Sequence, residues 1–206
     1  MITKAQFDSG GERGYTLLGL LALATIIMIF ATAAAPSIKQ QAQREREEEA
    51  IFRGEQVAEA LRTYITQSGQ IPNRMEQLQE GAPVPGRTRK LQVLRPSAAR
   101  DPLSKDGEWR VVISSIDRRL IDFGARVTAY NNGAAPTTTD QRMMPFVPQG
   151  FTIISDDGEP APNDEDATAN SSGPIIGVTS RSRRQSIINY YGISRHDHWV
   201  FTPLFK

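Results

Sequence analysis

The chain has 206 residues, of which 39% are hydrophobic and 23% are charged, and its formal net charge is only +1. This length suits one ordinary domain with an appendage, and the small net charge argues against a protein that binds nucleic acid through its overall charge. The chain has no cysteine, which excludes disulfide frameworks, zinc–thiolate sites and cysteine nucleophiles.

The most distinctive segment lies near the N-terminus, where no charged residue occurs from Tyr15 to Ala35. About twenty apolar residues are enough to cross a bilayer as one helix. A secretory signal peptide has a shorter apolar core that precedes its cleavage site, whereas the candidate cleavage site of this chain, after Gly14, precedes the apolar run. We therefore expect a membrane-spanning helix over 15–35. Basic residues occur on both sides of it, so the positive-inside rule does not indicate its orientation.

The helical pattern continues beyond Pro36, where we expect a kink because proline removes a backbone donor. The following segment is rich in Gln, Glu, Arg and Ala, which favour helix. Arg44 and Glu48 are one turn apart and are expected to form a surface ion pair. We expect one long helix over 15–68, with an apolar stripe in its second half that packs on the rest of the chain. The stripe consists of Ile38, Ala42, Ile51, Val57, Ala58, Leu61, Tyr64 and Ile65.

The remainder, 69–206, is expected to form a small α+β head. A short helix is predicted within 72–81, a connection over 82–100, and a variable insert over 120–170. Four segments have strand-like patterns, namely 108–116, 150–155, 174–180 and 198–204. In the first of them, Trp109, Val111 and Ile113 share one face. Because these strands do not alternate with helices, we expect an antiparallel sheet.

The N-terminal sequence "RGYTLLGLLALA" resembles the class III signal of type IV prepilins and type II secretion pseudopilins. Gly14 matches the glycine that precedes the cut in this family, and Tyr15, Thr16 and Leu17 match the residues that follow it. Pro36 matches a proline that many members carry about six turns into the mature helix. The stretches "IFRGEQVAEALRTYITQSGQIPNRMEQL", "DPLSKDGEW" and "GPIIGVTSRSRRQSI" also resemble pseudopilins, so the resemblance covers the chain except 120–170.

The resemblance implies that 1–14 is a leader removed by prepilin peptidase, and that the new amine of Tyr15 is N-methylated by the same enzyme. It implies a pilin-like fold and a single-pass inner-membrane protein with a periplasmic head. Its partners would be the lipid bilayer, other pseudopilins through their N-terminal helices, and the inner-membrane secretion platform. The implied function is structural, in pseudopilus assembly and protein export. The alternatives are a minor type IV pilin that binds DNA or a surface, and an anchored periplasmic protein that does not polymerise.

Gly19 departs from the family pattern, in which the fifth mature residue is a glutamate thought to meet the N-terminal amine of a neighbouring subunit. A carboxylate in hydrocarbon needs such a partner, and glycine cannot provide one. The departure leaves three readings open: a subunit at the filament tip, a minor or divergent subunit held by other contacts, or an anchored protein that does not assemble.

The sequence offers three further candidate sites, each with a simpler interpretation. His196 and His198 flank Asp197 and could share a metal, but a turn or the start of a strand is expected. The acids of 156–166 offer oxygen ligands of the kind that calcium prefers, but a solvated loop is expected and no EF-hand spacing occurs. The basic residues Arg181, Arg183 and Arg184 suit phosphates, but we expect a solvated hairpin turn, so nucleic acid is not an expected partner. No phosphate loop, nucleophile elbow or HExxH motif occurs, so neither an enzyme nor a cofactor is expected.

Overall fold

The computed structural model describes residues 12–113, 117–136, 138, 141–148, 150–152 and 173–205. The chain divides into two compact units, Met1–Gln43 and Arg44–Lys206. We call the second unit the head. It is an α+β unit with small antiparallel sheets, as expected.

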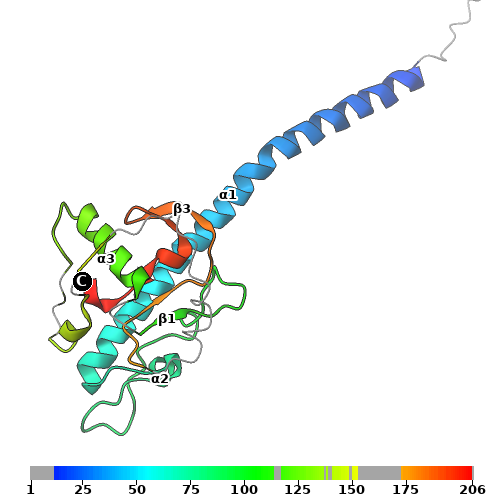
Figure 1. Ribbon diagram of the computed structural model, residues 1–206. Helices are drawn as coiled ribbons and strands as arrows, with labels where there is room; N and C mark the ends of the chain where they lie inside the picture. Colours follow the sequence, from blue (N-terminus) through cyan, green and yellow to red (C-terminus); the bar gives the residue numbers. More distant parts are fainter. Residues whose placement is uncertain are drawn as a thin grey trace, which may run out of the picture. The chain divides into compact units, whose positions relative to one another are not determined.

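Helix α1, Glu12–Ser68, is the longest element and contributes to both units (Figure 1). It confirms the long helix expected over 15–68. The backbone stays helical through Pro36, so the proline does not end the helix. The chain leaves the helix at Gly69, which has a φ of 72° and donates its N–H to Ile65 O at 2.9 Å. Glycine suits this place because a left-handed residue after a helix strains any side chain.

The part of α1 that belongs to the head buries one face against the core. Val57, Leu61 and Ile65 are completely buried, as the apolar stripe predicted. Ile38 and Ala42, two predicted members of the stripe, are exposed instead, because they precede Arg44, where the head begins. The predicted ion pair is present, with Arg44 Nε 3.1 Å from Glu48 Oε1.

Two antiparallel sheets lie in the head. The first has the order β1-β2-β5, and the second is a hairpin of β3 and β4. Their bounds are β1 Arg110–Val112, β2 Gly177–Thr179, β3 Gln185–Tyr190, β4 Ile193–Arg195 and β5 Val200–Phe201. Strands β1, β2 and β5 fall in three of the four predicted segments. In the fourth, residues 150–152 are irregular, and 153–155 lie outside the described residues.

The face predicted for the first strand is only partly correct. Trp109 is buried, but Val111 and Ile113 are only half-buried, whereas Val112 on the opposite face is buried. The reason is that the sheet is covered on both sides, so alternation does not separate a core face from a solvent face.

The remaining elements are short except for one helix. Helix α2, Met75–Glu80, confirms the helix predicted within 72–81. Helix α3, Arg118–Tyr130, lies largely in the predicted variable insert and was not expected. Its first turn is capped by Asp117, whose Oδ1 accepts the Arg119 N–H at 2.9 Å. Three 3-10 turns complete the described elements, η1 Met144–Phe146, η2 His196–His198 and η3 Pro203–Phe205.

Candidate functional site

The apolar segment Tyr15–Thr32 has a mean hydropathy of 2.2, and none of it is buried within the chain. Side chains are exposed all around the helix, for example Leu20 at 67% and Phe30 at 71%. A helix that is apolar on every side is not amphipathic and has to be covered by lipid or by other helices. By length and composition this segment is long and apolar enough to cross a membrane.

Two hydroxyl groups inside this segment, those of Thr25 and Thr32, are satisfied by the helix itself. Thr25 Oγ1 donates to Leu21 O at 2.8 Å, and Thr32 Oγ1 donates to Met28 O at 2.6 Å. In a medium without water, polar groups must find partners within the protein. These side chains of the segment therefore do not need water.

The residues of the predicted processing signal lie in the first turns of α1. Gly14, Tyr15, Thr16 and Leu17 all have helical backbone, and Tyr15 is 79% exposed. A Cβ built at Gly19 would meet no heavy atom within 4 Å. The fold of the subunit itself therefore does not require glycine at this position.

Within the head, a buried carboxylate of α1 that the sequence did not reveal joins the helix to the β3–β4 hairpin. Glu47 is 0% exposed, and its Oε2 accepts N–H groups of Ile187 at 2.9 Å and Ile188 at 2.8 Å. Its Oε1 lies 2.9 Å from His196 Nε2. Because Glu47 is 140 residues away from Ile187 in sequence, it joins α1 to the hairpin and to the turn that follows it.

The two histidines contact different partners. His196 is buried, and its Nδ1 lies 3.1 Å from Ser182 Oγ, so both ring nitrogens have neighbours within hydrogen-bond distance. His198 Nδ1 lies 3.4 Å from Asp122 Oδ2, which also accepts from Arg126 Nε at 2.9 Å. Among the described residues, no group of three His, Asp or Glu side chains is placed to hold a metal ion. The predicted turn is present as η2.

A second buried carboxyl group, that of Asp101, lies in the loop before β1. Asp101 accepts the Ser180 hydroxyl at 2.7 Å and the Leu103 N–H at 2.9 Å. Burial raises the pKa of Asp101, and these hydrogen bonds lower it in part. Ser182 N–H in turn donates to Ser180 Oγ at 3.1 Å, so buried polar groups connect this loop with His196 and Glu47.

The basic stretch 181–184 connects β2 to β3 and is not the turn of the hairpin that was expected there. The turn of the hairpin is at Tyr191 and Gly192, which both have positive φ, 51° and 78°. Arg181 Nη2 lies 3.0 Å from Glu108 Oε2, so part of the basic charge is paired within the head. The acids of 156–166, the calcium candidates, lie outside the described residues.

Comparison with known proteins adds no relative. The chain matches no protein-family model, no curated protein and no solved structure.

Proposed function

We propose that the chain is a structural subunit of the pseudopilin kind, held in the inner membrane by its N-terminal helix and then assembled with other subunits through that helix. The observation that carries the proposal is the apolar segment Tyr15–Thr32, which the chain itself leaves completely uncovered. The resemblance of Gly14 and the residues after it to a prepilin signal adds the processing step.

The physical argument is that the apolar segment is covered first by lipid and later by the helices of other subunits. Apolar helices gain little from meeting in lipid, which is as apolar as they are. When a subunit is drawn out of the bilayer, the same surface must be covered by the helices of neighbouring subunits. At about 25 cal/mol per Å² of buried apolar surface, this contact is a large favourable term for each subunit. One segment can thus serve first as an anchor and then as a filament core, with the head outside the membrane on the periplasmic side.

The processing step is tested by the mass of the mature protein. The full chain is produced in bacterial membranes together with a prepilin peptidase. We expect loss of 1–14 and a mass increase of one methyl group at Tyr15. Gly14→Asp should block the cut, whereas Gly11→Asp, in the same leader, should not. Retention of Met1 in the unaltered chain would remove the processing step from the proposal.

Assembly is tested by crosslinking, which the absence of native cysteine makes simple. Leu20→Cys and Ile27→Cys lie in the apolar segment, and Arg87→Cys lies in an exposed turn of the head. In cells that contain the secretion machinery, we expect crosslinked multimers for the two helix variants and few for the head variant. Monomers in all three cases would support an anchored protein that does not polymerise.

The DNA-binding alternative receives less support from the head. Arg181 is paired with Glu108, and the cavity that both residues line contains two further carboxylates, Glu76 and Asp106. These carboxylates would repel a phosphate placed beside them. We therefore retain the structural role as the proposed function.

A further inference from the structure

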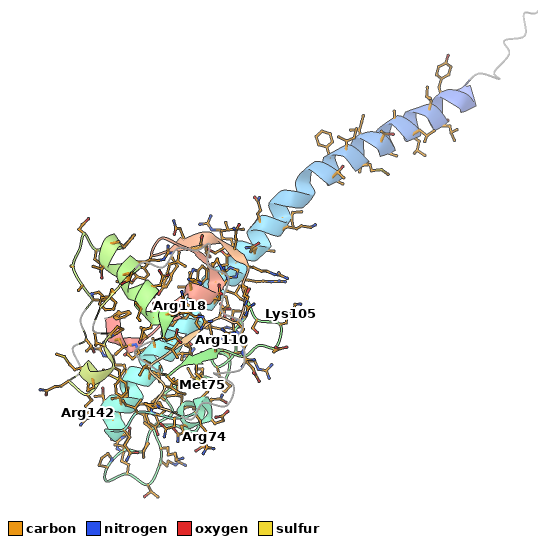
Figure 2. The ribbon with its side chains drawn as sticks, in the orientation of Figure 1. Arg74, Met75, Lys105, Arg110, Arg118 and Arg142 are labelled. Carbon is orange, nitrogen blue, oxygen red and sulfur yellow. The ribbon has the colours of Figure 1, made fainter. Side chains whose placement is uncertain are left out.

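A cavity of about 960 Å³ lies beside β1 in the head. It is lined by the start of α2 with Arg74 and Met75, by the segment that ends at Arg100, and by Trp109, Arg110 and Val111 of the β1 region. Figure 2 labels Arg74, Met75 and Arg110, which come from two separate elements of the head. The volume of the cavity is within the range of sites that bind small ligands or short peptides.

The cavity is lined by residues of the β1 region and by residues on both sides of it, Arg100 on one side and Ile175 and Arg181 next to β2 on the other. In the antiparallel register, Arg110 pairs with Thr179 of β2, so continuing the ladder places Arg181 opposite Glu108 on the β2 side. Arg100 also forms a bridge with Glu108 and must therefore lie on the other side of the strand. Beyond that bridge, among the described residues, no strand pairs with the outer edge of β1.

Residues of β1 and the residue before it form part of the cavity wall. Trp109 is only 5% exposed, and its indole N–H donates to Ala98 O at 2.9 Å, so its side chain is turned into the core. Three consecutive residues, 109–111, line the cavity although alternate side chains of a strand point to opposite faces. An unpaired strand edge with accessible backbone is a template for an added strand.

The lining of the cavity carries one more positive than negative charge, with Arg74, Arg100, Arg110 and Arg181 against Glu76, Asp106 and Glu108. Arg110 and Arg100 line it, and neither guanidinium forms a hydrogen bond or an ion pair with the residues that the structure describes. Burial, followed by the nearby guanidinium groups of Arg119 and Arg183, lowers the pKa of Arg110, and Asp197 offsets this only in part. A further anion, from outside the chain, would therefore stabilise the half-buried cation.

We propose that this cavity binds an extended peptide segment of a partner protein, which pairs with the outer edge of β1 and places an acidic side chain against Arg110. The main-chain hydrogen bonds would provide affinity, and the charge contact would provide selectivity. The apolar parts of Met75 and Val111 offer surface for the alternate side chains of the segment. This inference concerns the head alone and does not depend on how the apolar helix assembles.

A carboxylate suits this cavity better than a phosphate. Glu76, Asp106 and Glu108 also line it, and of these three only Glu108 forms an ion pair among the described residues, with Arg181. A phosphate monoester, with up to two negative charges, would be repelled by these carboxylates more strongly than a singly charged side chain. A peptide can also place a basic or amide side chain near Glu76 or Asp106, which nucleic acid cannot do.

The test uses the full chain in detergent micelles and a library of pentapeptides blocked at both ends. Aspartate is fixed at the central position and the other four positions are random, and a second library has asparagine at the centre. We expect retention of the aspartate library alone, and slower backbone hydrogen exchange at 108–112 in its presence. Arg110→Gln should weaken binding about tenfold, because a hydrogen bond to a charged group is lost. N-methylated versions of the retained peptides should lose binding.

Two further variants distinguish a loss of peptide binding from a folding defect. Arg100→Gln changes an exposed residue at the other end of the cavity and should also weaken retention, and Arg87→Gln, in an exposed turn away from it, should not. The proposal is overturned if neither library is retained, if both are retained equally, or if Arg110→Gln and Arg100→Gln bind like the unaltered chain. Binding of duplex DNA that is lost in Arg110→Gln, without binding of peptide, would also overturn it and identify a phosphate site.

Discussion

Glu47 is the residue on which the attachment of the β3–β4 hairpin to α1 depends. A buried carboxylate is strongly disfavoured unless donors surround it, and here two backbone N–H groups and the His196 ring lie within 3 Å. The hydrogen bonds to Ile187 and Ile188 also fix the position of β3 along the helix.

Glu47→Gln should destabilise the head by about 3 kcal/mol, because it removes the negative charge that accepts these hydrogen bonds and puts an N–H₂ in place of Oε1, which lies 3.1 Å from the Ile187 nitrogen. The measurement is urea unfolding of the full chain in detergent, followed by the fluorescence of Trp109 and Trp199, which are both buried in the head. The control is Glu48→Gln, which alters an exposed ion pair with Arg44 and should cost about 0.5 kcal/mol. Equal losses in the two variants would contradict this role of Glu47.

Asp101 should give the head a contribution to stability that increases on acidification. Burial raises its pKa in the folded state above the ordinary value of 3.8, so the folded chain binds more protons than the unfolded chain between 3.8 and the raised pKa. The free energy of unfolding from this group therefore rises as the pH falls through that window.

The comparison that isolates this contribution is Asp101→Asn, which has no proton to bind. The free energy of unfolding of the unaltered chain, relative to this variant, should be larger near pH 4 than at neutral pH. Asp106→Asn, in an exposed part of the same loop, provides the control. A difference that is constant with pH would show that Asp101 does not titrate in this way.

At the scale of elements, α1 and β5 approach each other closely at Gly54. Gly54 is buried in α1, and a Cβ at this position would overlap the ring of Phe201. The ring has little room to move, because it packs edge-on against Trp109 with centroids 5.7 Å apart and lies 5.6 Å from Tyr190. Glycine at this point allows the helix and the sheet to pack directly.

Gly54→Ala should destabilise the head by about 1–3 kcal/mol, although alanine favours helix, since overpacking a filled core costs more than the gain in propensity. The matched control is Gly19→Ala in the same helix, where a Cβ meets nothing within 4 Å. Urea unfolding of both variants is the measurement. A gain in stability for Gly54→Ala would mean that Phe201 can rearrange.

The elements that could be predicted from sequence are those with a strong local pattern. The long helix, α2 and the three strands of the first sheet belong to this group. Helix α3 has Leu120, Phe123 and Val127 at helical spacing after the cap Asp117, but Gly124 interrupts the pattern. That glycine is explained only by tertiary structure, because a Cβ there would overlap the Phe151 ring.

The hairpin and the Glu47 site were missed for two different reasons. The hairpin turn places Tyr191 at a positive φ, which a tyrosine rarely adopts, so the usual turn signal is weak. The partners of Glu47 are about 140 residues away, and no local pattern indicates that one acid in a charged run is buried. Sequence reasoning correctly placed Arg44 and Glu48 of the same run on the surface.

For the whole molecule, the segment Tyr15–Thr32 presents a much larger uncovered apolar surface than any other described helix. After a cut behind Gly14, the amine of Tyr15 would be a charge at the end of this surface. In a packed array of such helices, that charge needs a carboxylate nearby, because an unpaired charge in an apolar environment is costly. Gly19 provides no such group, so other contacts would have to drive assembly.

Gly19→Glu should therefore increase incorporation of the subunit into filaments, because the new carboxylate can pair with the amine of a neighbour. The substitution fits the subunit, since a Cβ at this position has free space around it. The measurement is the fraction of subunit in sheared or crosslinked filaments, in cells that contain the assembly machinery. Gly19→Gln has the same shape without the charge and should remain at the level of the unaltered chain. Two outcomes would contradict this prediction: both variants assemble equally well, or Gly19→Glu does not change incorporation. In either case charge pairing with the amine does not limit assembly. The contacts that place this subunit in a filament must then be sought elsewhere in the chain.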